Sequence, residues 1–141
     1  MIKVETLGML DVAKVNPILT SESEVKNYSF ITVDDELYLI SNTITGDKSY
    51  AKDATIPAGD YLNGFLVEAW KGQKLIIDGC HVEGGISTLE VGNKLVAQEN
   101  GLLKKEEDVS SGVYFVVTDT KVTLTEAAIK AKVAVATSAG A

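Results

Sequence analysis

The adjacent pair Cys80-His81 is the most reactive combination of side chains in this sequence of 141 residues. A thiol activated by an imidazole can act as a nucleophile. The chain has one cysteine and one histidine, so no second histidine is available as a distant base. Neighbouring residues on a strand point to opposite faces, which would keep the thiol and the imidazole apart. We therefore expect no catalytic residues and no enzymatic activity, and interpret the pair as a buried or half-buried thiol beside a surface histidine.

Metal and cofactor sites also lack the residues that they need. One cysteine and one histidine are too few for a typical zinc site. The carboxylate runs 34–36 and 106–108 lack the spacing of an EF-hand loop, and they fit solvated loop tips. No Gly-x-Gly-x-x-Gly or phosphate-loop motif is present. We expect neither a metal ion nor a cofactor.

The segment Glu68-Ala69-Trp70-Lys71-Gly72 resembles the Glu-Ala-Met-Lys-Met hairpin of biotin-carrying domains. Here tryptophan and glycine replace the two methionines. The resemblance implies a covalent carrier that is modified on Lys71, and a small β binding or carrier module is therefore one alternative function. Trp70 itself, at the end of a predicted strand, is expected in the core.

Short apolar segments separated by turn signals must position these residues. Residues 29–33 and 37–40 flank an acidic turn, and residues 88–91 and 94–97 flank Gly92-Asn93, so each pair predicts a hairpin. Further strands are predicted within 62–70, 74–77, 113–118, 121–125 and 132–137. Residues 98–111 read as an exposed polar loop, and 125–129 as one helical turn.

This spacing predicts an all-β fold. We expect a single small β-barrel or β-sandwich of about 8–10 short strands, with an N-terminal arm and at most short helical turns. The predicted organisation is an arm and hinge over 1–27, a β domain over 28–137 and a frayed tail over 138–141.

Charge and hydrophobicity exclude several classes of partner. The formal net charge is −7, and all 13 basic residues are lysine. Without arginine, which binds phosphate with two parallel hydrogen bonds, an acidic chain is poorly suited to nucleic acid or to an anionic membrane. No apolar run is long enough to span a bilayer or to form the core of a signal peptide. We expect synthesis in the cytoplasm.

The first 27 residues differ from the rest because neither a helical nor a strand period holds for long. Pro17 interrupts any helix through this stretch. We interpret it as an apolar arm that binds a partner, followed by a polar hinge; the alternative is a first strand and loop of the β domain. The predicted partner-binding residues are Leu7, Met9, Leu10, Val12, Val15, Ile18 and Leu19.

One further segment reads Ile56-Pro57-Ala58-Gly59-Asp60-Tyr61-Leu62-Asn63-Gly64. Together with the short β segments after it and the closing Val-Ala-Val-Ala strand, it resembles the head decoration, or cement, proteins of tailed bacteriophages. The resemblance is one of pattern, and it transfers no functional residue. It implies a non-enzymatic virion protein that binds the major capsid protein on the outer surface of the capsid and stabilises the shell, often as a homotrimer. A phage tail tube or adaptor component is the alternative within the structural class.

Overall fold

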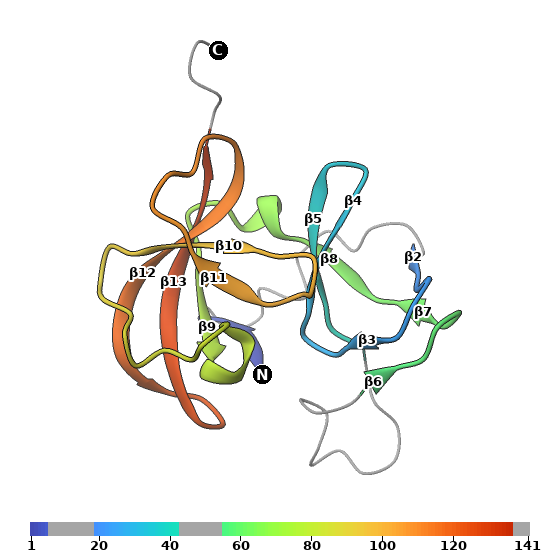
Figure 1. The fold of residues 1–141 in the computed structure, drawn as a ribbon, viewed down its shortest axis with the longest axis horizontal. Helices are drawn as coiled ribbons and strands as arrows, with labels where there is room; N and C mark the ends of the chain where they lie inside the picture. The colour runs from blue at the N-terminus through green and yellow to red at the C-terminus, as the bar shows by residue number, and fades with distance from the viewer. Residues whose placement is uncertain (6–18, 43–54, 137–141) are drawn as a thin grey trace.

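The computed structural model describes residues 1–5, 19–42 and 55–136, and this part of the chain is all-β, as predicted (Figure 1). The ladders between its strands are antiparallel. Two short 3₁₀ turns, η2 (Val67–Trp70) and η3 (Gly79–His81), are the helical segments. The strands are β1 (Ile2–Val4), β2 (Leu19–Thr20), β3 (Val25–Lys26), β4 (Phe30–Val33), β5 (Glu36–Ile40), β6 (Thr55–Ile56), β7 (Tyr61–Leu62), β8 (Gly64–Leu66), β9 (Lys74–Asp78), β10 (Lys94–Ala97), β11 (Leu103–Lys105), β12 (Gly112–Thr123) and β13 (Ala127–Ala136).

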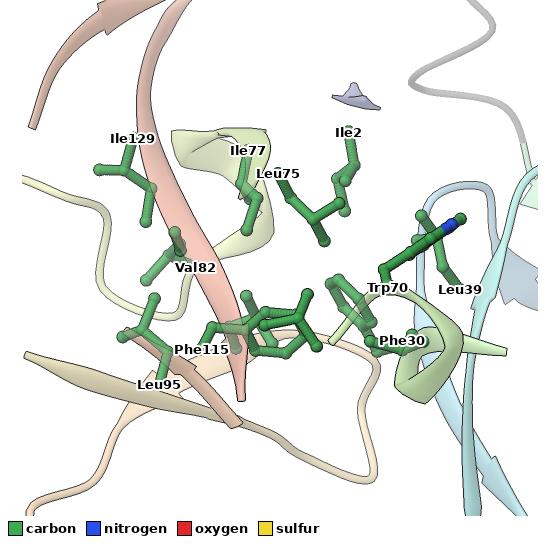
Figure 2. Packing of buried hydrophobic residues seen from close by; sticks show 14 of the residues in the cluster. Ile2, Phe30, Leu39, Trp70, Leu75, Ile77, Val82, Leu95, Phe115 and Ile129 are labelled. Atoms are coloured by element: carbon green, nitrogen blue, oxygen red, sulfur yellow. The ribbon is translucent and has the colours of Figure 1, made fainter. Parts of the chain in front are cut away.

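The larger sheet has six strands in the order β1-β9-β13-β12-β10-β11. Its long hairpin β12–β13 forms because alternating side chains on each strand are apolar, so that one face can be buried. Phe115 and Val117 from β12 and Ile129 from β13 are almost wholly buried. All three belong to one cluster with Leu75 and Ile77 of β9, and this cluster is the main core of the protein. Figure 2 shows Phe115, Ile129, Leu75 and Ile77 within it.

The first residues of the chain belong to this sheet. β1 pairs with β9, and Ile2 and Val4 are 4% and 5% exposed in the main core. The predicted arm over 1–27 therefore does not begin at residue 1. The apolar–polar–apolar triplet of residues 2–4 was too short to indicate a strand by itself, and its pairing with β9, more than seventy positions away, decides its structure.

The smaller sheet has three strands in the order β4-β5-β8. The predicted hairpin over 29–40 is confirmed, with Asp34 and Asp35 as its two-residue turn, both at positive φ. Four consecutive residues of β5 are buried because both faces of this sheet are covered. Leu39 packs into the main core, whereas Tyr38 and Ile40 pack into a second, smaller cluster with Ile56 and Leu62.

Short two-stranded ladders hold this smaller cluster in place. β2 pairs with β7, and β3 pairs with β6. In the turn between β6 and β7, Asp60 N donates to Pro57 O at 3.2 Å, and Gly59 takes a φ of +89°. Gly59 N donates to Ser21 O at 2.7 Å, which ties the turn to the segment after β2.

Three local predictions are wrong. Residues 88–91 form turns instead of a strand, and only β10 of that predicted hairpin is present. The predicted loop 98–111 contains β11, whose Leu103 is fully buried in the main core. The predicted helical turn over 125–129 is instead the start of β13, because Ala128 and Ile129 pair with Asp78 and Ile77. In the last two cases pairing with other strands overrides a weak local preference.

Candidate functional site

The strongest cluster of titratable groups lies where β9 passes beneath the N-terminus. Asp78, the last residue of β9, is fully buried. Its carboxylate accepts hydrogen bonds from the Met1 ammonium group at 2.8 Å, from the Thr125 amide at 3.1 Å and from the Thr125 hydroxyl. Burial alone raises the pKa of Asp78, but the hydrogen bonds from Met1 and Thr125 outweigh burial and leave the pKa below its ordinary value. Asp78 is therefore ionised and fully engaged.

His81 completes this cluster from η3. Its Nε2 lies 2.8 Å from the Met1 ammonium nitrogen, and its ring packs edge-on against Tyr28. An ammonium group can only donate, so Nε2 accepts. Burial, followed by the charge of the N-terminal ammonium group, lowers the pKa of His81 to about 4. The imidazole is therefore neutral near pH 7, and its basic nitrogen is already occupied.

Cys80 lies between these two residues in the chain but is exposed. Its amide donates to the Glu126 carboxylate at 3.1 Å. Burial of the thiol, with a hydrogen bond to Glu126, raises the pKa of Cys80 to about 11. A thiol with so high a pKa carries little thiolate at neutral pH, and thiolate is the nucleophile.

The arrangement thus supports an anchor for the N-terminus and offers no nucleophile–base pair. The interpretation of the two side chains from sequence is reversed: His81 is 3% exposed, whereas Cys80 is the exposed member. The reason is local backbone geometry. Residues 79–81 form a 3₁₀ turn instead of a continuing strand, so strand alternation does not decide which side chain points inward.

The segment that resembles a biotin-carrier hairpin adopts another local structure. Trp70 is 1% exposed and stacks on Phe65, which confirms that it is a core residue. Glu68 to Trp70 lie in η2, and the exposed Lys71 follows as the cap of that turn. The backbone around Lys71 is therefore a 3₁₀ turn that leads into β9, and no strand precedes the lysine directly.

The acidic runs lie at the surface, as expected. Asp34 and Asp35 form the β4–β5 turn, and Glu107 and Asp108 are exposed in the loop before β12. Among the described residues, no group of three or more His, Cys, Asp or Glu side chains is arranged to hold a metal ion.

Two surface cavities flank the β4–β5 hairpin. Cavity I, of about 630 Å³, has an apolar wall that includes Val25, Ile31 and Leu62, with Glu22 and Glu99 beside it. Cavity II, of about 350 Å³, lies between the hairpin and the larger sheet. It is lined by Leu37 and Val113, with the carboxylates of Asp35, Glu36 and Glu68. Thr32 lines both cavities.

Tyr61, an exposed aromatic residue, is adjacent in sequence to a residue that lines cavity I. Tyr61 of β7 is 71% exposed, whereas its neighbour Leu62 is buried and lines the cavity. Thr20, which pairs with Tyr61 across the β2–β7 ladder, lines the same cavity. The sequence analysis did not single out Tyr61 as a functional residue. The signal that could have found it is strand alternation: if the apolar Leu62 faces inward, the side chain of Tyr61 faces outward.

Of the seven partner-binding residues predicted from sequence, the structure describes only the backbone of Leu19. Leu7, Met9, Leu10, Val12, Val15 and Ile18 lie outside the described residues. Leu19 is in β2, opposite Leu62, and its side chain is not described. The helical turns among the described residues are too short to cross a lipid bilayer.

Comparison of the chain with protein-family models, with curated proteins and with solved structures finds no match.

Proposed function

We propose that this protein is a non-enzymatic structural protein that binds other proteins in an assembly. The most specific form of the proposal is a decoration protein on the outer surface of a bacteriophage capsid. Its partner would be the major capsid protein, with further copies of the chain forming a homotrimer around each site. An acidic, hydrated surface suits a component that keeps a large particle soluble.

The observation that carries this proposal is the exposure of Tyr61. It lies in the segment 56–64, whose sequence pattern resembles decoration proteins, directly after the exposed turn of Pro57 to Asp60. Tyrosine is enriched among residues that dominate protein–protein binding, because it combines apolar area with a hydroxyl group. A large aromatic side chain that is 71% exposed, on a strand held by a short ladder, suits an anchor for a partner.

The buried polar cluster around Asp78 is a second observation that supports a structural role. The one histidine is buried and engaged by the N-terminus, and the one thiol has its pKa raised to about 11. These are the groups that sequence analysis considered for nucleophilic catalysis. In the folded protein these groups take part in structural contacts. Under the proposal, binding to a partner uses other residues at the exposed surface.

A capsid-occupancy assay tests the proposal. Purified shells of the cognate major capsid protein, the partner that the proposal requires, are mixed with the wild-type protein or with Tyr61→Ala. Wild type should bind and raise the temperature at which shells break, and Tyr61→Ala should bind at least about 10-fold more weakly. Val91→Ala is the matched control, because Val91 is 66% exposed but lies in the loop before β10; it should bind like wild type.

Failure of the wild-type protein to bind shells contradicts the proposal. Binding to assembled tail tubes instead would assign the alternative tail role. A mass addition on Lys71 in protein purified from its native source would assign the carrier alternative.

A further inference from the structure

Among the residues that the structure describes, no strand pairs with the outer edge of β4, and the proposed function leaves this edge unused. β4 is an outer strand of the three-stranded sheet, and within that sheet it pairs with β5. Phe30 N donates to Gly101 O at 3.1 Å, so the backbone groups of Phe30 point away from β5. In an antiparallel ladder this direction alternates between residues. The N–H and C=O of Thr32 therefore also point away from β5, and Thr32 is exposed.

The two cavities lie on opposite faces of this edge. Ile31 and Val33, which face the smaller cluster, line cavity I. Leu37, which pairs with Thr32 and faces the main core, lines cavity II. Thr32 lies between the cavities and lines both. A strand added at this edge would point successive side chains alternately into cavity I and cavity II.

Charge indicates which kind of strand fits. Glu22 and Glu99 line cavity I, and Asp35, Glu36 and Glu68 line cavity II. No lysine is among the described residues that line either cavity. Each cavity also has an aliphatic wall. A segment that carries basic and aliphatic residues would match both the charge and the apolar surface.

We propose that the β4 edge at Thr32 binds an extended, lysine- or arginine-bearing segment of a partner protein by strand addition. The partner's backbone pairs with the N–H and C=O of Thr32, and its alternate side chains enter the two cavities. This inference deepens the proposed function, since it names where and by what chemistry a protein partner would dock. The available ladder is short because Gly101 already occupies the neighbouring position at Phe30. Each contact would therefore be weak and would depend on many copies acting together.

The test uses the full chain, labelled with ¹⁵N, and three synthetic hexapeptides with blocked ends. The first is Lys-Val-Lys-Val-Lys-Val, the second replaces lysine with glutamate, and the third is the first peptide with methylated backbone nitrogens. The lysine peptide should shift the Thr32 amide resonance and slow its hydrogen exchange. The glutamate and methylated peptides should bind at least about 10-fold more weakly, because one reverses the charge and the other removes the backbone donors.

Two kinds of variant test separately how backbone hydrogen bonds and charge contribute to peptide binding. Thr32→Pro removes the N–H at an edge position that tolerates proline, and should weaken the lysine peptide at least about 10-fold. Val91→Ala, at an exposed position that lines neither cavity, should bind like wild type. The double variant Glu68→Lys, Glu99→Lys, at exposed positions, lowers the negative charge around the cavities and should strongly reduce the preference for the lysine peptide over the glutamate peptide. It decides the question even if Thr32→Pro does not fold.

The inference is overturned if the lysine peptide leaves the Thr32 amide unchanged, or if it binds folded Thr32→Pro as tightly as wild type. The capsid-occupancy assay, repeated with the same proteins, then shows whether only the β4 docking site is wrong or the decoration role is wrong as well. Full occupancy by Thr32→Pro would keep the decoration role and reject the β4 edge as its docking site. Peptide binding at Thr32 by a protein that binds no shells would keep the edge and reject the decoration role.

Discussion

The ammonium group of Met1 lies 2.8 Å from the carboxylate of Asp78, a residue 77 positions further along the chain. This ion pair fastens β1 to the end of β9, beside the backbone ladder between the two strands. The Asp78 side chain is fully buried, whereas the Met1 side chain is partly exposed. The pair therefore couples the first residue of the chain to the end of the second strand of the larger sheet.

Asp78→Asn should lower the free energy of unfolding by about 2–3 kcal/mol, because a buried amide cannot replace the carboxylate's charge-assisted hydrogen bonds to Met1 and Thr125. Urea unfolding followed by the fluorescence of Trp70, the single and buried tryptophan, measures the change. Glu90→Gln removes the same unit of charge at an exposed position, and should change stability by less than about 0.5 kcal/mol. Equal unfolding midpoints for the two variants would contradict the role assigned to Asp78.

Stability should decrease as the pH falls from about 6.5 to about 4, the ordinary and the folded-state pKa of His81. In this window the unfolded chain binds a proton on His81 and the folded protein does not, so acid favours unfolding. The loss from His81 should approach about 3 kcal/mol. The lowered pKa of Asp78 adds a further loss below its ordinary value of 3.8, because the unfolded carboxylate is protonated first. His81→Gln should flatten the part of the profile above about pH 4, measured as urea midpoint against pH; an unchanged slope would show that another group is responsible.

Cys80 should react slowly with a thiol reagent although it is exposed. Raising the pKa from 9.0 to about 11 lowers the thiolate fraction about 100-fold near pH 8, and the rate should fall in proportion to the loss of thiolate. The measurement is the rate of reaction with a chromogenic disulfide, compared with the same protein unfolded in urea. Glu126→Gln should accelerate the folded protein, because it removes a carboxylate that disfavours the thiolate. Equal rates for the folded and unfolded protein would contradict the raised pKa.

Gly101→Ala should destabilise the junction between the smaller sheet and the larger one. A Cβ on Gly101 would lie 2.8 Å from Ser29 Cβ, and its φ is +85°, which L side chains rarely adopt. We expect a loss of about 2–4 kcal/mol from strain and overpacking together. Gly92→Ala is the matched control, with φ at +96° and open space around the new methyl group; it should cost only about 1 kcal/mol. Thermal melting compares the two, and similar losses would mean that contact with Ser29 is unimportant.

Ile2→Ala should lower the free energy of unfolding by about 2–4 kcal/mol, because Ile2 is buried against β9 in the main core. Lys3→Ala, the neighbouring substitution on the opposite face of β1, should cost under about 1 kcal/mol. Thermal and urea unfolding of the two variants provide the comparison. If Ile2→Ala melts like wild type, the first residues act as an arm and not as a strand of the sheet.

The sequence by itself determined the class of the fold and the features that depend on near neighbours. Alternation and turn residues located the β4–β5 hairpin, β9, most of β12 and the second half of β13. The turn chemistry of Pro57 to Asp60 was also readable, because a hydrogen bond over four residues and one glycine decide it. Burial of Trp70 followed from its size and its apolar neighbours.

Only the tertiary structure decided the features that depend on distant pairing. Residues 2–4 became a strand through β9, and Leu103 became a core residue within a stretch that reads as polar. The 3₁₀ turn at 79–81 placed His81 inside and Cys80 outside, and the two cavities arose where the β4–β5 hairpin meets other elements. A short segment buries too little surface to specify its own structure, so partners far along the chain supply the energy that selects it.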